Sequence, residues 1–178
     1  MKRVVSYLLS AFLLIISQST FADVADSNYK LGAGDTVQIS VYGEVDLSIN
    51  SLYISNNGTF NYPYLGQINV LGKTPAQLQA LIYKGLKGDY LISPKVRVNI
   101  VSFRNIYVNG EVQRPGGYPY QPGLTVDKAV ALAGGFTERA SMNKITIKSD
   151  DAGAKKSKAV LGQQVEPGDV IVVSESFF

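Results

Sequence analysis

The sequence predicts an α+β fold of two small, mainly β domains, each with one packed helix. Short runs in which apolar and polar residues alternate are typical of half-buried strands. Two helix starts, at Thr74 and Thr125, each precede apolar residues at helical spacing. A break near Ser102 closes the first strand–helix–strand unit, so each unit contains one helix. We therefore expect the two domains to span residues 29–102 and 103–178.

Residues 1–22 have the pattern of a secretory signal peptide. Two basic residues precede an apolar run over residues 4–16 that only two serines interrupt, and Ala22 is a small residue at a suitable cleavage site. The run is shorter than the roughly 20 apolar residues that a membrane-spanning helix needs. We expect secretion, with an uncleaved N-terminal anchor as the alternative, and a flexible N-terminus over residues 23–28.

The composition excludes several classes of function. The chain of 178 residues has 17 basic and 14 acidic residues, and loss of the two basic residues of the signal peptide leaves 15 against 14. Nucleic acid is not expected as a partner, because it requires a clustered excess of Lys and Arg. The sequence has no His and no Cys, which removes the common catalytic triads, thiolate nucleophiles and zinc ligand sets. We expect no catalytic residue, no metal and no cofactor.

The first domain opens with strand patterns. Residues 37–41 alternate between apolar and polar, as a half-buried strand does. Residues 52–54 and 60–62 alternate on either side of an Asn-Gly pair, which is the strongest short-range signal for a β-hairpin because both turn positions tolerate positive φ. Residues 96–100 again alternate between apolar and polar. We expect a strand, a hairpin and, beyond a helix, a further strand.

The helix of the first domain is expected to begin after Thr74. Thr74 can cap the helix, Pro75 suits the first helical position, and Gln77 completes a capping box. Lys84 and Lys87 complement the negative end of the helix dipole before a glycine ends the helix. The expected apolar stripe consists of Leu78, Leu81 and Ile82.

The second domain is expected to begin with a strand, a reversal and a helix. β-Branched residues recur over residues 106–112, and residues 114–117 predict a tight reversal because proline fixes φ and glycine permits positive φ. Thr125 is a natural N-cap, and Asp127 complements the positive end of the helix dipole. The apolar stripe consists of Val126, Ala129, Val130 and Ala133, and Gly134 and Gly135 end the helix.

The last part of the chain predicts two more strands. We expect them at residues 145–147 and 170–173, with a lysine-rich loop over residues 150–158 between them. The pair Gly168-Asp169, which precedes the last strand, echoes Gly34-Asp35 before the first. We interpret this repetition as the same kind of turn placed before each of the two strands.

The candidate contact residues are tyrosines that flank prolines and arginines that flank the strand into the reversal. A tyrosine ring can stack on a sugar face while its hydroxyl forms a hydrogen bond, but tyrosine is also enriched in packed and subunit contacts. The arginines could pair across subunits or remain solvated. The candidate subunit or polymer contacts are Tyr62, Tyr64, Arg104, Arg114, Tyr118 and Tyr120.

Two blocks of sequence resemble one known family. The strings G-E-V-x-R-P-G-x-Y, x-G-x-T-V and A-L-A-G-G-F-T follow one another over residues 110–137, and they resemble the SLBB (soluble ligand-binding β-grasp) repeat of the Wza-type outer-membrane polysaccharide export family. An upstream block resembles the family's export domain in order. It consists of Y-K-L-G-A-G-D at residues 29–35, Gly58-Thr59-Phe60, Pro63, Leu65-Gly66, Gly72-x-Thr74 and Pro94-x-Val96-x-Val98.

The resemblance implies a polysaccharide export domain over residues 29–102 and an SLBB β-grasp domain over residues 103–178. Members of this family form rings in the periplasm through which capsular polysaccharide, exopolysaccharide or O-antigen-like polymer leaves the cell. They work with an inner-membrane polysaccharide copolymerase and are conduits, not enzymes. The resemblance therefore implies a homo-oligomeric ring that conducts polymer. The alternative is a monomeric soluble ligand- or glycan-binding β-grasp module.

The chain departs from the larger members of the family at both ends. Many members carry a lipid-modified cysteine after the signal peptide, whereas this chain continues with Asp23, so lipid attachment is not expected. Larger members also have further repeats and a C-terminal amphipathic helix that spans the outer membrane. With one repeat and a short C-terminus here, we expect a periplasmic component that reaches the outer membrane through a separate channel. A small outer-membrane β-barrel, suggested by Phe178, is disfavoured by the two expected helices.

Overall fold

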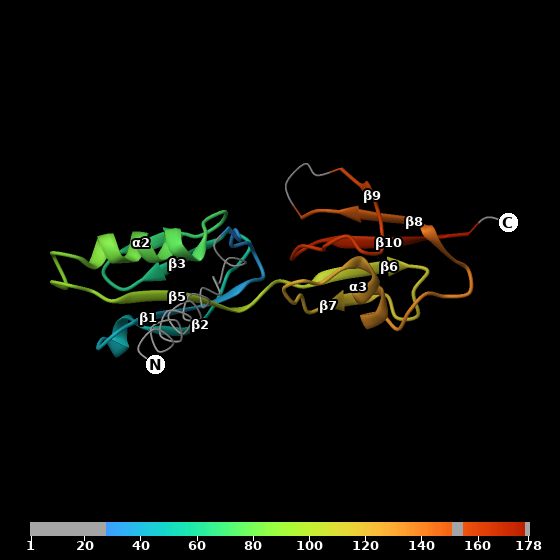
Figure 1. Ribbon diagram of the computed structural model, residues 1–178. Helices are drawn as coiled ribbons and strands as arrows, with labels where there is room; N and C mark the ends of the chain where they lie inside the picture. Colours follow the sequence, from blue (N-terminus) through green and yellow to red (C-terminus); the bar gives the residue numbers. More distant parts are fainter. Residues whose placement is uncertain (1–27, 151–154, 177–178) are drawn as a thin grey trace, which may run out of the picture.

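The computed structural model describes residues 28–150 and 155–176, so the expected signal peptide and nearly all of the expected flexible N-terminus lie outside the described residues. The chain forms two lobes, which Figure 1 shows end to end, joined by the linker between β5 and β6. The N-terminal lobe contains β1 (Thr36–Val41), η1 (Val45–Leu47), β2 (Ile49–Tyr53), β3 (Thr59–Tyr62), β4 (Gly66–Asn69), α2 (Pro75–Leu86) and β5 (Val96–Ser102). The C-terminal lobe contains β6 (Ile106–Gly110), β7 (Gly116–Tyr118), α3 (Val126–Leu132), β8 (Ala140–Lys148), β9 (Ser157–Ala159) and β10 (Val170–Glu175).

The N-terminal lobe is built around β1. This strand lies between β2 and β5 and pairs with both in antiparallel fashion. Its alternating pattern sends Val37, Ile39 and Val41 to one face, where all three are buried. Helix α2 covers this face with its own buried side chains, and each apolar residue buried in this way contributes about 1.5–3 kcal/mol relative to exposure. The residues of α2 in this core are Leu78, Ile82 and Leu86.

The expected capping box of α2 is present. The Thr74 hydroxyl accepts the N–H of Gln77 at 3.2 Å, and the Gln77 side chain accepts the N–H of Thr74 at 3.0 Å. The apolar stripe differs in one member from the expected one, because Leu81 is 37% exposed and Leu86 is fully buried. The reason is geometric, since Leu78, Ile82 and Leu86 are spaced four residues apart and share one face of the helix.

The expected hairpin across Asn57 and Gly58 was wrong. The turn itself forms, with the N–H of Gly58 donating to the carbonyl of Ser55 at 2.8 Å and φ at Gly58 of 63°. However, β2 pairs with β1, whereas β3 pairs with β4 in a separate two-stranded sheet. An Asn-Gly turn specifies a change of direction but not the partner strand, and here it carries the chain from one sheet to the other.

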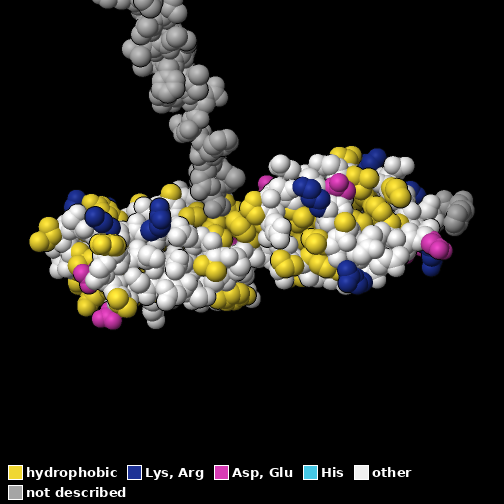
Figure 2. Space-filling view, turned by 60° about the horizontal axis from the view of Figure 1, so that its bottom comes forward, with side chains coloured by type: hydrophobic (Ala, Val, Ile, Leu, Met, Phe, Trp, Pro, Cys, Tyr) yellow, Lys and Arg dark blue, Asp and Glu magenta, His cyan; other side chains and the backbone are white. Residues whose placement is uncertain are grey.

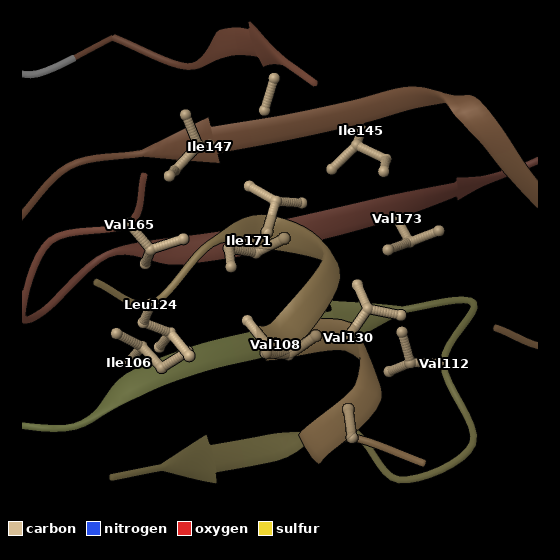
Figure 3. Close-up of a cluster of buried hydrophobic side chains, with 14 residues drawn as sticks. Ile106, Val108, Val112, Leu124, Val130, Ile145, Ile147, Val165, Ile171 and Val173 are labelled. Atoms are coloured by element: carbon tan, nitrogen blue, oxygen red, sulfur yellow. The ribbon is translucent and has the colours of Figure 1, made fainter. Parts of the chain in front are cut away.

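The C-terminal lobe contains the larger sheet, in the order β7-β6-β10-β8-β9. Strand β10 lies at its centre, parallel to β6 and antiparallel to β8. Helix α3 packs against one face, and the side chains labelled in Figure 3 point toward one another between this helix and the sheet. The fully buried members include Ile106, Val108, Val126, Ile145 and Ile171. With two main helices and mainly β structure in small lobes, the predicted α+β fold class is confirmed.

Two local expectations for the C-terminal lobe need correction. The reversal after β6 occurs, but Gly116 and Gly117 belong to strand β7 and the positive φ of 86° falls at Gly110. A side chain at Gly110 would overlap the carbonyl of Val173 on β10, so the strand exit requires glycine there. The expected loop over residues 150–158 also ends earlier, since Lys158 pairs with Thr146 within the β8–β9 ladder.

Candidate functional site

The junction between the lobes is organised by Arg104, in the linker between β5 and β6. Its backbone N–H donates to Oδ1 of Asp35 at 2.8 Å. Its Nη1 lies 3.2 Å from Oδ2 of the same carboxylate and donates to the hydroxyl of Tyr29 at 2.7 Å. The side chain of Asp35 is completely buried, which makes this a shielded, hydrogen-bonded ion pair within the N-terminal lobe.

The same arginine reaches into the C-terminal lobe. Its Nε lies 3.1 Å from Oδ2 of Asp150, whose side chain is 56% exposed. The Nε–H makes no hydrogen bond, so this contact is an ion pair without directional bonding. The backbone completes the link, because the N–H of Gly168 donates to the carbonyl of Asn105 at 3.2 Å. Arg104 is thus bound by carboxylates from both lobes.

Three glycines form a cradle around this arginine. A β-carbon at Gly34 would lie 3.0 Å from Cβ of Arg104, and one at Gly168 would lie 2.7 Å from its Nε. A β-carbon at Gly32 would overlap the guanidinium itself. Two of these glycines belong to the N-terminal lobe and one belongs to the C-terminal lobe. Because none of them has a side chain, the side chain of Arg104 fits between the backbones of the two lobes.

The two Gly-Asp turns are built alike, as the sequence echo indicated. Asp35 accepts the N–H of Gly32 at 2.8 Å, and Asp169 accepts the N–H of Glu166 at 2.8 Å, in each case three residues back. Both carboxylates are buried. Burial raises the pKa of Asp169, and the hydrogen bond from the Glu166 N–H and, to a smaller extent, the nearby Arg104 only partly oppose this effect. The repeated turn is a structural device, and Arg104 lies between its two copies.

Aromatic rings form a second link across the junction. Phe103 makes edge-to-face contacts with Tyr29 at 5.0 Å and with Tyr120 at 5.2 Å between ring centroids. The hydroxyl of Tyr29 donates to Asp35, with oxygen distances of 2.7 and 2.9 Å. Burial raises the pKa of this hydroxyl far above its ordinary range, and the hydrogen bond to Asp35 acts in the same direction. Tyr120 also packs against the core of the C-terminal lobe, so the aromatic chain connects the two lobes.

An open cleft of about 650 Å³ lies at this junction. Two tyrosines from different lobes line it, Tyr53 at 66% exposure and Tyr107 at 48%. The remaining lining is mostly polar, with Asp150 as its exposed carboxylate. The other polar side chains in the lining are Thr36, Asn56, Ser102, Arg104 and Asn105.

The structure places the six candidate contact residues in three different regions. Arg104 and Tyr120 meet at the junction, where both line a second cleft of about 450 Å³. Arg114 and Tyr118 lie next to each other in the C-terminal lobe, where the Tyr118 hydroxyl donates to the carbonyl of Arg114. Arg114 also donates to the last carbonyl of α3, that of Leu132, at 3.3 Å.

The third region is the β3–β4 hairpin. Tyr62 is a core residue, 2% exposed, whose hydroxyl donates to the carbonyl of Leu47 at 2.6 Å, and burial raises its pKa to about 12. Tyr64 is 67% exposed, has φ of 64° and stacks on Tyr90 with ring centroids 4.7 Å apart. Neighbouring tyrosines around one proline therefore have opposite environments.

The sequence interpretation missed several residues of the junction. Tyr29 and Asp35 stand within the block that carries the family resemblance, and that block was the available signal for them. Nothing in the local pattern marked Tyr53, Tyr107 or Asp150, because they come together only when the lobes meet. Over the described part of the chain, no group of three His, Cys, Asp or Glu side chains could hold a metal ion.

On the face that Figure 2 shows, the surface charge of the described residues has no strong focus. Figure 2 shows the Lys and Arg side chains of one face scattered over both lobes, without a continuous basic patch. In the ranges that the structure describes, no helix is long and apolar enough to cross a membrane.

Comparison with known families gives two matches in succession. Residues 23–101 match the profile of polysaccharide biosynthesis/export proteins, and residues 105–157 match that of the SLBB domain. The first match covers the N-terminal lobe up to the linker, and the second begins immediately after Arg104. The expected family resemblance is therefore confirmed over both lobes.

Several known proteins are similar to this chain. The exopolysaccharide production protein ExoF of Rhizobium meliloti (strain 1021) is 34% identical over 148 residues, which cover 75% of this chain and 35% of ExoF. The EPS I polysaccharide export outer membrane protein EpsA of Ralstonia nicotianae is 26% identical over 172 residues, covering 81% of this chain and 45% of EpsA. The polysialic acid transport protein KpsD of Escherichia coli is 29% identical over 127 residues, covering 68% of this chain and 22% of KpsD. The chain thus spans less than half the length of each of these relatives.

Proposed function

Because this chain belongs to the family of polysaccharide biosynthesis/export proteins, we propose that it is a ring-forming component of a polysaccharide export machine that conducts capsular polysaccharide or exopolysaccharide towards the outer membrane. The observation that carries the proposal is the succession of an export-domain match over residues 23–101 and an SLBB match over residues 105–157. The named relatives are export, production and transport proteins, which favours this role over a monomeric ligand-binding module.

The proposal includes the domain assignment, with an export domain over residues 29–102 and an SLBB domain over residues 103–178. It places the protein in the periplasm, without a lipid anchor. Its partners are the polymer, an inner-membrane polysaccharide copolymerase, a separate outer-membrane channel and further copies of the chain. We assign it no catalytic step, which agrees with a sequence that lacks His and Cys.

Four of the candidate residues remain proposed subunit or polymer contacts. Tyr64 is exposed, with its ring presented together with that of Tyr90. Arg114 and Tyr118 lie near the end of α3, and Tyr120 lines the smaller cleft at the junction. Arg104 and Tyr62 act within the chain, through the ion pairs of the junction and through the core of the N-terminal lobe.

The experiment that tests the export role compares polysaccharide at the cell surface and in the periplasm in three strains. One strain lacks the chain, one expresses it again in full, and one expresses it without residues 1–22. We expect surface polymer to be lost in the first strain, restored in the second and still absent in the third. Normal surface polymer in the strain that lacks the chain would contradict the export role.

The ring is tested separately on the purified chain. Native mass spectrometry should give a single stoichiometry above the monomer, as a closed assembly does. A stable monomer at all concentrations would instead support the ligand-binding module.

A further inference from the structure

We infer that the cleft between the lobes binds a short segment of uncharged polysaccharide, with Tyr53 and Tyr107 as stacking platforms. The inference rests on the proposed export function and identifies where the conduit touches its polymer. Arg104, which lines the cleft, was among the candidate contacts chosen from sequence, whereas neither tyrosine was.

The two tyrosines are exposed enough to offer their rings to a sugar. Each ring belongs to a different lobe, lies outside both hydrophobic cores, and lines the same cleft. The ring of Tyr107 lies against Gly117 of the neighbouring strand, where a β-carbon would come within 3.1 Å of it. Because Gly117 has no side chain, the ring of Tyr107 can lie directly against the backbone of this residue. An aromatic face held in this way can pack on the C–H groups of a sugar while its hydroxyl stays in water.

The polar lining suits sugar hydroxyls. Asn56 and Asn105 each offer an amide that donates and accepts, and Thr36 and Ser102 offer hydroxyls. The volume of about 650 Å³ is within the usual size range of small-ligand sites, and a mostly polar lining around two tyrosine rings suits an uncharged sugar with its many hydroxyls. The cleft has room for a few sugar rings of a longer chain.

The charges of the cleft select against acidic sugars. Among the lining residues that the structure describes, the one cation is Arg104, and the buried Asp35 already neutralises it. The exposed charge that remains is the carboxylate of Asp150, at 56% exposure. A uronate, sialate or phosphate group would meet this carboxylate without a free cation to compensate, and juxtaposed like charges disfavour binding.

A polar strip continues from the cleft along the N-terminal lobe. On β1 and β5, Gln38 lies beside Asn99 and Ser40 lies beside Arg97. These residues lie on the face opposite to the buried Val37 and Ile39, so α2 does not cover them. A polymer leaving the cleft therefore meets further amides, a hydroxyl and the guanidinium of Arg97, which suits a conduit that binds its cargo at many weak points. The selection against acidic sugars is thus expected within the cleft and not along this strip.

The test measures sugar binding to protein purified from cells that express the full chain. The probes are maltohexaose and cellohexaose as uncharged oligosaccharides and hexagalacturonate as the acidic one. Saturation-transfer NMR detects contact whatever the size of the assembly, and calorimetric titration gives the affinity. We expect an uncharged probe to bind in the millimolar range and hexagalacturonate to bind at least about tenfold more weakly.

The variants locate the binding. Tyr53→Ala with Tyr107→Ala should weaken binding about tenfold or more, whereas Tyr53→Phe with Tyr107→Phe should retain most of it, because the rings remain. The matched control is Tyr83→Ala with Ile92→Ala, which removes two exposed side chains that neither line the cleft nor belong to the proposed contacts, and which should leave affinity unchanged. An unchanged circular dichroism spectrum and melting temperature of the alanine pair keep loss of folding apart from loss of binding.

Three results would overturn the inference: no binding of either uncharged probe, tighter binding of hexagalacturonate, or equal loss in the control pair. The outcome is separable from that of the export proposal. If the cleft variant binds sugar normally while the full chain restores surface polymer, the cleft inference fails and the export role stands. If the cleft binds sugar as expected but the chain does not affect surface polymer, the export role fails and the binding site stands.

Discussion

At the scale of single residues, Arg104 is the position where a substitution should have the largest effect. Arg104→Ala would leave the fully buried Asp35 with backbone N–H donors but without its cation. Breaking a buried ion pair by removing one partner costs about 3–5 kcal/mol, and the remaining hydrogen bonds to Asp35 favour the lower end. We expect the free energy of unfolding, measured by urea denaturation, to fall by about 3 kcal/mol.

A matched control exists in the same chain. Arg139 pairs with Glu175 at the surface, where the two side chains are 67% and 40% exposed. Because exposed ion pairs contribute little to stability, Arg139→Ala should leave the denaturation midpoint nearly unchanged. If both substitutions had the same small effect, Arg104 would be a solvated charge and not the organiser of the junction.

Asp169 should make stability depend on pH in a direction set by its burial. Burial raises the pKa of this carboxyl, so the folded state favours the protonated form. Its contribution to stability is fully present below the ordinary aspartate pKa of about 3.9 and is lost as pH rises through the raised pKa. Asp169→Asn keeps an acceptor for the N–H of Glu166 without this ionisation, so its stability relative to the wild type should improve between acidic and neutral pH.

Asp127 provides the opposite case for comparison. The hydrogen bond from Thr125 lowers the pKa of Asp127, so its contribution is present above the ordinary aspartate pKa and is lost as pH falls through the lowered value. Denaturation curves collected from pH 3 to pH 7 should therefore give Asp127→Asn a relative stability that falls with rising pH. Parallel pH profiles for the two variants would contradict the assignment.

Sequence reasoning at this scale identified residue types but not their partners. Arg104 was a candidate because of its place beside a strand, yet its partner Asp35 is 69 residues away. Tyr62 and Tyr64 have the same local pattern, but one is buried and the other is exposed. Such differences arise from tertiary packing, which a local pattern does not contain.

At the scale of secondary-structure elements, the two N-caps should respond differently to the same substitution. Thr74 closes a complete capping box, whereas the Thr125 side chain makes no capping hydrogen bond to the backbone of α3. Thr74→Ala should therefore reduce the free energy of unfolding by about 1 kcal/mol. Thr125→Ala should reduce the free energy of unfolding by clearly less than this, and thermal and urea denaturation can compare the two variants. Equal losses would mean that the observed capping bonds do not determine the stability of these helices.

The elements themselves were largely predictable, because caps, prolines and period-2 patterns are local signals. The pairing of the strands was less so. The turn at Asn57 and Gly58 was predicted, but β2 and β3 join different sheets. Likewise, the central position of β10 between β6 and β8 depends on contacts between residues far apart in the sequence, which no short pattern encodes.

At the scale of the whole molecule, the two-lobed α+β architecture was predictable and the cleft was not. Each lobe has its own hydrophobic core around one main helix, as the two periodic units indicated. The cleft exists only because the ends of β2 and β6 face a common space across the linker. Its chemistry therefore depends on how firmly the linker fixes one lobe against the other.

This dependence leads to a prediction about cooperativity. Two side chains of the linker tie the lobes together, Phe103 through its ring contacts with Tyr29 and Tyr120, and Arg104 through carboxylates of both lobes. While these ties hold, unfolding of one lobe exposes groups that the other lobe had buried, so the lobes should unfold together. Phe103→Ala combined with Arg104→Ala removes both ties and leaves each core intact, so the lobes should then unfold independently.

Differential scanning calorimetry can distinguish these cases. We expect a single transition in the wild type, with the calorimetric enthalpy equal to the van't Hoff enthalpy, and two resolved transitions in the double variant. Arg139→Ala combined with Tyr64→Ala, which removes an exposed arginine and an exposed aromatic ring away from the linker, should keep the single transition. A double variant that still unfolds in one step would show that the lobes are coupled through other contacts. Two transitions in the wild type would show that the junction does not couple them at all, and the cleft would then lack the fixed geometry on which its stacking platforms depend.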